Sequence, residues 1–142
     1  MASERLILDS GFALEAILPT KEAWRVEAVE LIQRIADRDV DARVPWIFFA
    51  ECAAVCTRKI RDSKVRLDKR IAAEFLEQID GLGMHVDLTL DGAGFMHANA
   101  ISWQCGAYDS IYIDAARRMA IPVATRDKGM VAACRLAKVE VL

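Results

Sequence analysis

The chain has 142 residues, of which 54% are hydrophobic and 28% are charged, and this is enough apolar material for one sizeable core. Its formal net charge of -2 excludes a protein that coats nucleic acid through its overall charge. The N-terminal residues lack a basic segment before an apolar run, and no window reaches the about 18 apolar residues that a membrane span needs. We therefore expect one soluble, cytoplasmic domain covering residues 1–142, without membrane contact.

Short apolar runs alternate along the chain with segments of helical periodicity. The apolar runs predict strands at residues 5–8, 42–45, 84–90, 121–125 and 138–142. The periodic segments predict helices at residues 11–18, 21–38, a segment that contains Glu51, 65–79, 91–105, 108–120 and 127–137. Short strands that alternate with helices are typical of an α/β domain with a mainly parallel sheet covered on both faces.

Two acidic residues stand where predicted strands end. Asp9 follows the first strand and Asp127 comes just after the strand at 121–125. Because functional residues in such sheets gather beyond the carboxyl ends of the strands, we expect these two acids at the same edge. A turn at the strand end for Asp9 and a helix N-cap for Asp127 are the structural alternatives.

Glu51 lies in the almost wholly apolar stretch WIFFAECAAV. On a helix its neighbours are Ile47 and Phe48 one turn before, and Ala54 and Val55 one turn after, so its side chain belongs to an apolar face. A buried carboxylate without a partner costs several kcal/mol. Glu51 therefore requires a hydrogen bond, a cation or a metal ion.

Asp109 repeats this pattern, because Tyr112 and Ile113 follow it at three and four positions. Asp114 differs, since Arg117 and Arg118 stand at the same offsets and predict an exposed acid with ion-pair partners on its own helix. We therefore expect a structural role for Asp114 and a buried site for Asp109. A helix N-cap is the alternative for Asp109.

The residue types in this chain exclude several chemistries. His85 and His97 lack the H-x-x-x-H spacing of a zinc site. No G-x-S-x-G motif and no glycine-rich phosphate loop occur. The remaining candidates are carboxylate oxygens, which suit Mg²⁺ or Mn²⁺, the ions that hold phosphates and activate water.

The order of these residues resembles the PIN-domain nucleases, in particular the VapC-like toxins of bacterial toxin–antitoxin pairs. The resemblance runs from LILDS, with Asp9, through the helix with Glu51 after a VP entry, to the final VEVL. Its most specific parts are YDSIYIDAA, with Asp109, and IPVATRDKGM, with Asp127. It implies a single three-layer PIN-like domain with a central sheet flanked by helices.

Within that family the four acids, Asp9, Glu51, Asp109 and Asp127, would be the catalytic pocket that holds one or two Mg²⁺ or Mn²⁺ ions. Ser10 and Thr125 match positions that hydrogen-bond to ligands or bound water in such pockets. The chain departs from the usual pattern at Gly11, which follows the pair Asp9-Ser10, and at Ser110, which follows Asp109. These departures affect the surroundings of the pocket and remove no implied ligand.

The resemblance further implies metal-dependent hydrolysis of RNA phosphodiester bonds, a homodimer and a cognate antitoxin as inhibitor. Two alternatives remain open at this point. One is a catalytically silent PIN-like module that binds RNA or protein, although such modules tend to lose their acids. The other is a receiver-like phospho-acceptor domain, which usually has adjacent early acids where this chain has Asp9 alone.

Basic residues near the middle and the end of the chain are candidates for contact with an RNA backbone. A solvated helix face explains the first group equally well, and an ion pair at a helix start explains the second. The candidates are Arg58, Lys59, Arg61 and Lys64 in the first group, and Arg126 and Lys128 in the second.

Overall fold

The computed structural model describes residues 3–62, 64 and 66–142. Four parallel strands form one sheet in the order β3-β2-β1-β4. The strands are β1 (Glu4–Leu8), β2 (Val40–Pro45), β3 (His85–Asp87) and β4 (Val123–Ala124). The helices are α1 (Ser10–Leu14), α2 (Glu22–Ala36), α3 (Ile47–Arg61), α4 (Lys69–Gly81), α5 (Ala93–Trp103), α6 (Ala107–Met119) and α7 (Lys128–Leu136).

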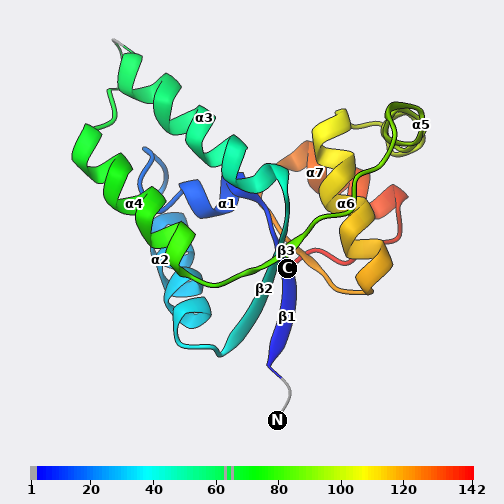
Figure 1. Cartoon of the computed structure of the whole chain (residues 1–142), viewed down its shortest axis with the longest axis horizontal. Coiled ribbons are helices and arrows are strands. Elements are labelled where there is room, and N and C mark those ends of the chain that lie inside the picture. Colours follow the sequence, from blue (N-terminus) through cyan, green and yellow to red (C-terminus); the bar gives the residue numbers. More distant parts are fainter. Residues whose placement is uncertain (1–2, 63, 65) are drawn as a thin grey trace.

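The helices cover both faces of the sheet, which confirms the predicted α/β class. Figure 1 shows α1 to α4 on one side of the strands and α5 to α7 on the other. Strand β1 lies in the middle, and its residues Leu6, Ile7 and Leu8 are at most 1% exposed. Where a strand is buried on both faces it is apolar at successive positions, which explains the unbroken apolar run of Leu6, Ile7 and Leu8.

The sheet brings together segments from opposite ends of the chain. Ile7 pairs with Val123 and Leu8 with Ala124. Because the strands are parallel, β1, β2 and β4 all end at the same edge, and α1, α3 and α7 begin there. This edge carries the acids that the sequence singled out.

Several predicted elements are shorter in the structure. The helix predicted at 11–18 ends at Leu14, and the strand predicted at 84–90 ends at Asp87. The carboxylate of Asp87 accepts hydrogen bonds from the backbone N–H and the hydroxyl of Thr89. These bonds form a turn that ends the strand. The strand predicted at 138–142 is only an isolated bridge between Val123 and Val141, because its partner β4 has just two residues.

The helix predicted at 65–79 begins later than the sequence pattern indicates. Val65 lies outside the described residues, and α4 begins at Lys69. Asp68 caps this helix, because its Oδ1 accepts hydrogen bonds from the backbone N–H groups of Arg70 at 2.8 Å and Ile71 at 3.1 Å. A capping aspartate sets a helix start that hydrophobic periodicity alone does not locate.

Asp114 corrects one of the expectations. Its ion pair with Arg118 is present, with Nε and Oδ2 2.9 Å apart, but the residue is buried and only 7% exposed. Arg118 also pairs with Asp87 at the end of β3, so the guanidinium joins α6 to the sheet and lies close to both carboxylates. The prediction of an exposed acid was wrong because helical spacing takes no account of a neighbouring strand.

Across the residues that the structure describes, every helix is too short or too polar to pass through a membrane.

Candidate active site

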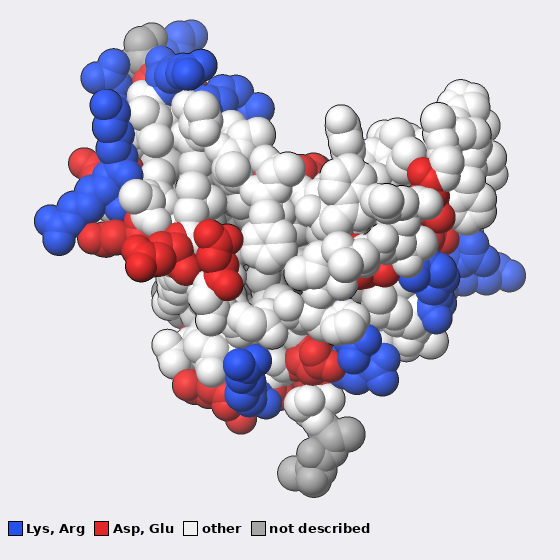
Figure 2. All heavy atoms as spheres, viewed as in Figure 1, with Lys and Arg blue, Asp and Glu red and all other residues white. Residues whose placement is uncertain are grey.

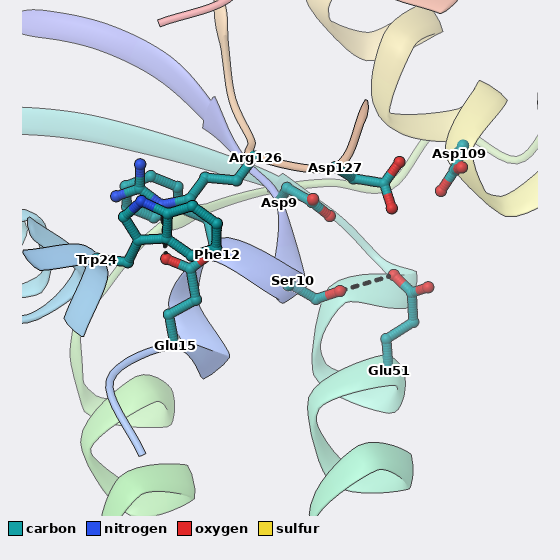
Figure 3. A pocket seen from close by; sticks show the side chains of 10 residues that line it. Asp9, Ser10, Phe12, Glu15, Trp24, Glu51, Asp109, Arg126 and Asp127 are labelled. Carbon is teal, nitrogen blue, oxygen red and sulfur yellow. Dashed lines mark hydrogen bonds and ion pairs between the residues drawn. The ribbon is translucent and has the colours of Figure 1, made fainter. Parts of the chain in front are cut away.

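A cavity of about 390 Å³ opens at the edge where β1 and β4 end. All four predicted acids line it, together with Ser10 and residues of α1, α2 and the loop before α7 (Figure 3). The lining residues are Asp9, Ser10, Gly11, Phe12, Glu15, Trp24, Glu51, Asp109, Arg126 and Asp127. The acids come from four separate segments, and the fold brings together Asp9 and Asp127, which are 118 positions apart in the sequence.

Asp9 is the most buried of the four acids, with 8% of the residue exposed. The hydroxyl of Thr125 donates a hydrogen bond to its Oδ2 at 2.7 Å, and the backbone N–H of Asp9 donates to the carbonyl oxygen of Ala124. Burial raises the pKa of Asp9, hydrogen bonds from Thr125 and Gly11 oppose this, and the charges of Glu51 and Asp127 add to the rise.

Glu51 projects from α3 toward the other acids (Figure 3). The hydroxyl of Tyr112 donates a hydrogen bond to its Oε1 at 2.6 Å, and the hydroxyl of Ser10 donates to the same oxygen at 3.4 Å. Burial is the largest cause that raises the pKa of Glu51, and the hydrogen bond from Tyr112 is the largest that lowers it. The main partner of this half-buried carboxylate is thus Tyr112.

The sequence reasoning missed Tyr112 as a part of the site. It was read only as an apolar neighbour of Asp109, although it lies in the YDSIYIDAA segment that carried the resemblance. A buried tyrosine normally places its hydroxyl on a polar partner, so its position on the same helix face as Asp109 was the available signal.

Asp109 lies in the first turn of α6, and the N-cap of that helix is Gly106. The N-cap alternative for Asp109 was therefore wrong. Its carboxyl is half-buried and faces the same space as Asp9 and Asp127. Burial, followed by the charges of Asp9 and Asp127, raises the pKa of Asp109 from its ordinary 3.8 to about 6.

Asp127 is the N-cap of α7, which confirms the structural alternative for this residue. Its Oδ1 accepts a hydrogen bond from the backbone N–H of Met130 at 2.8 Å. Its own backbone N–H donates to the hydroxyl of Thr125 at 3.2 Å, and the same hydroxyl donates to Asp9. Capping occupies one carboxylate oxygen, so a role at the cavity and a role in the helix are compatible.

The four acids repel one another without a compensating protein cation. Among the described residues, none of them forms an ion pair with a lysine, arginine or histidine. An all-oxygen set with uncompensated charge fits Mg²⁺ or Mn²⁺. No group of three Asp, Glu, His or Cys side chains in the described part of the chain is close enough to form a ready metal site. Mg²⁺ commonly binds through one or two carboxylates and keeps several waters, so an open arrangement of this kind suits it.

Arg126 does not face the acids, although it directly precedes Asp127. Its Nε lies 2.7 Å from Oε2 of Glu15, and its Nη2 forms a second ion pair with Oε2 of Glu27. The predicted alternative of an ion pair is therefore present, and the positive charge of Arg126 is compensated. Lys128 is exposed at the start of α7.

The other basic candidates do not line the cavity. Arg58, Lys59 and Arg61 lie in the last turn of α3, and Lys64 follows in the connection to α4. Figure 2 shows basic side chains gathered around this connection, at the upper left of the molecule. Lys59 has an acidic partner, Asp62, with 3.9 Å between nitrogen and oxygen.

A comparison with protein-family models matches residues 6–136 to the PIN domain. The chain belongs to the PIN-domain family. Members of this family are generally nucleases, and this favours a nuclease over a receiver-like phospho-acceptor domain. A comparison with curated proteins found no match.

Solved structures share the PIN fold at low sequence identity. The protein PAE2754 from Pyrobaculum aerophilum has a TM-score of 0.71 at 16% identity, over 99% of this chain and 84% of that one. A chain of FitAB bound to an IR36 DNA fragment has a TM-score of 0.67 at 20% identity, over 96% and 93%. FitAcB from Neisseria gonorrhoeae has a TM-score of 0.63 at 17% identity, over 96% of each chain.

We predict that Asp109→Asn stabilises the metal-free protein at pH 7. Folding raises the pKa of this carboxyl from 3.8 to about 6, so the folded chain binds the proton more tightly than the unfolded chain does. The stabilisation from that proton is complete below pH 3.8 and is lost as the pH rises through 6. After allowance for solvent screening at a half-buried site, the gain from the substitution at pH 7 is about 1–2 kcal/mol.

Urea unfolding in EDTA at a series of pH values measures this effect. The stability of the Asp109→Asn variant should exceed that of the parent at pH 7 and approach it below pH 4. Asp80→Asn, which removes an exposed acid on α4, is the matched control. Its stability to urea should change with pH as that of the parent does. An equal pH dependence in the parent and in Asp109→Asn would show that Asp109 carries no raised pKa.

Proposed function

We propose that the chain is a divalent-metal-dependent endoribonuclease that hydrolyses RNA phosphodiester bonds, and that it is the toxin of a toxin–antitoxin pair. The observation that carries this proposal is the meeting of Asp9, Glu51, Asp109 and Asp127 in one cavity, where none of the four forms an ion pair with a described basic side chain. Membership of the PIN-domain family supports the nuclease activity. The likeness to chains of FitAB and FitAcB supports the role as a toxin.

The four acids are the residues that would hold Mg²⁺ or Mn²⁺. Such an ion supplies Lewis-acid polarisation of phosphoryl oxygens and activation of water. The chain itself supplies orientation: Thr125 holds Asp9 by a hydrogen bond of 2.7 Å, and Tyr112 holds Glu51 by one of 2.6 Å. Carboxylates held in this way need little rearrangement when a phosphate arrives, and electrostatic preorganisation of this kind is a main source of catalysis.

We expect cleavage of single-stranded RNA to require Mg²⁺ or Mn²⁺ and to stop in excess EDTA. Asp9→Asn and Asp109→Asn should each lower kcat by about 100-fold or more, because each removes a negatively charged oxygen where cationic charge must be held. Gel analysis of a labelled RNA measures the rate, and Asp80→Asn serves as the control with full activity. Equal cleavage with and without EDTA would reject the metal dependence.

We propose that the basic side chains at the α3–α4 connection follow the RNA backbone. Arg58 and Arg61 are both exposed, and neither has an ion-pair partner among the described residues. A cation without a partner gains more from a phosphate than a cation already paired with a carboxylate. Lys59, Lys64 and Lys128 are further candidates for the same track, whereas Arg126 is held by Glu15 and Glu27.

Replacing both Arg58 and Arg61 by Gln should weaken RNA binding and flatten its salt dependence. Two lost phosphate contacts reduce the slope of log K against log salt by about 1.4 for a single strand. Fluorescence anisotropy across KCl concentrations measures the slope, in an Asp109→Asn background that prevents cleavage. Arg34→Gln, which removes an exposed arginine paired with Glu4, should keep the parental slope. An unchanged slope in the double variant would remove these residues from the RNA track.

We further propose that the chain forms a homodimer through α5. We also propose that it has a cognate antitoxin and a cytoplasmic location. Residues 93–103 of α5 include no Asp, Glu, Lys or Arg, and Figure 2 shows an uncharged surface over this helix at the upper right. Phe95 is 50% exposed and Ile101 is 67% exposed. Exposed apolar side chains on a surface without charges mark an interaction site.

Sedimentation equilibrium should therefore give twice the chain mass of 15.8 kDa. Ile101→Asp should give the monomer mass, because a carboxylate in a closed apolar interface would lose its water without gaining a partner. Val29→Asp, at a side chain of α2 that is 49% exposed, is the control and should stay dimeric. A monomeric parent protein would reject the dimer, and a dimeric Ile101→Asp variant would place the interface elsewhere.

A further inference from the structure

The cavity continues beyond the four acids into an aromatic part. Phe12 of α1 and Trp24 of α2 line this part, together with Arg126 from the loop before α7. Figure 3 shows the two rings and the guanidinium gathered on the opposite side of Asp9 from Asp109. The catalytic role proposed above uses only the acidic part, so the aromatic part still lacks an explanation.

Arg126 fixes the two rings and is itself fixed. Its guanidinium carbon lies 4.8 Å from the centre of the Phe12 ring and 5.2 Å from the centre of the Trp24 ring. Glu15 and Glu27 pair with the same guanidinium. An arginine held by two carboxylates and two rings loses little further freedom when a ligand binds. The aromatic part is therefore a preorganised surface.

Trp24 is placed for contact with a ligand and not only for packing. The residue is half-buried and lines a cavity that reaches the acids. The exposed side chain of Lys21 places Nζ 4.6 Å from the centre of the indole ring. This ammonium group has no carboxylate partner among the described residues, so it can move to a phosphate when another group covers the ring.

An aromatic ring beside positive charge is the arrangement by which proteins hold single-stranded nucleic acid. Every base has a flat face that stacks on such a ring, whereas a peptide side chain would gain from the ring only if it were itself flat or cationic. The ring and the acids line the same cavity of about 390 Å³. This volume is within the usual range for small-molecule sites.

We propose that Trp24, supported by Phe12 and Arg126, is a stacking subsite for a nucleobase next to the phosphate that the acids engage, with Lys21 on the adjoining phosphate. The inference rests on the proposed function, since it takes RNA as the substrate. In this proposal Trp24 binds a base of the substrate without sequence preference, whereas the acids act on the phosphate backbone.

Adenosine 5′-monophosphate and ribose 5-phosphate test the subsite without any cleavage. Both carry the phosphate, and only the first carries a base. In Mg²⁺ buffer we expect the nucleotide to quench the fluorescence that Trp24 contributes, measured as the difference between the parent and Trp24→Phe, while ribose 5-phosphate leaves it unchanged. An identical response to both compounds, or no response to the nucleotide, would overturn the subsite even if the protein cleaves RNA.

Cleavage kinetics test the consequence for the substrate. Trp24→Ala should raise KM for a single-stranded RNA about 10-fold with kcat little changed, and Trp24→Phe should restore most of the loss because it keeps a ring. Trp46→Phe replaces a 41% exposed tryptophan outside the cavity and should match the parent.

Quenching by the nucleotide in a protein that does not cleave RNA would support the subsite and reject the nuclease instead. An unchanged KM in Trp24→Ala, with loss of binding to an antitoxin, would assign the rings to protein docking and overturn the subsite.

Discussion

The parallel pairing of β1 with β4 is the constraint on which the site depends. Leu8 lies beside Ala124 in the sheet, and the backbone N–H of Asp9 continues the pairing by donating to the carbonyl oxygen of Ala124 at 3.1 Å. Thr125, the next residue, then reaches Asp9 with its hydroxyl. Because these bonds join β1 to β4, Asp9 and Asp127 come together only when these two strands have paired.

The distribution of charge explains why the cavity needs a cation from outside. At the other side of the sheet, Arg118 pairs with the buried Asp114 and with the half-buried Asp87. Arg126 lies next to Asp127 in the chain, yet it turns toward Glu15 and Glu27. At the cavity, Asp9 and Glu51 instead receive neutral hydroxyl donors, which orient a carboxylate without cancelling its charge. Burial first, and then the charges of Asp9 and Asp127, raise the pKa of Asp109 to about 6.

The sequence was sufficient to predict the fold class and the position of the acids, because both follow from local pattern. An apolar run followed by an acid, as in LILDS, identifies a buried strand and its end. Helical spacing correctly placed Glu51 and Asp109 on inward faces. Ser10 and Thr125 were named from the resemblance, and the structure places both hydroxyls on carboxylates.

What could not be predicted depends on contacts between segments distant in sequence. Tyr112 meets Glu51 across 61 positions, and Arg126 meets Glu27 across 99, so no local window contains either pair. Asp114 looked exposed because its spacing to Arg118 is that of a surface pair, and only the position of β3 shows that the pair is covered. The tail at 138–142 has strand composition, but the short partner strand limits its pairing to one bridge.

The capping role of Asp127 decides how mutational scanning of this protein should be interpreted. An alanine there would remove a carboxylate from the cavity and also release the first turn of α7, so a loss of function would have two causes that an activity assay cannot separate. Asparagine keeps a side-chain oxygen that can cap a helix and changes only the charge. In a library of variants, tolerance of asparagine but not alanine at this position would therefore mark an architectural requirement, and intolerance of both would mark an ionic one.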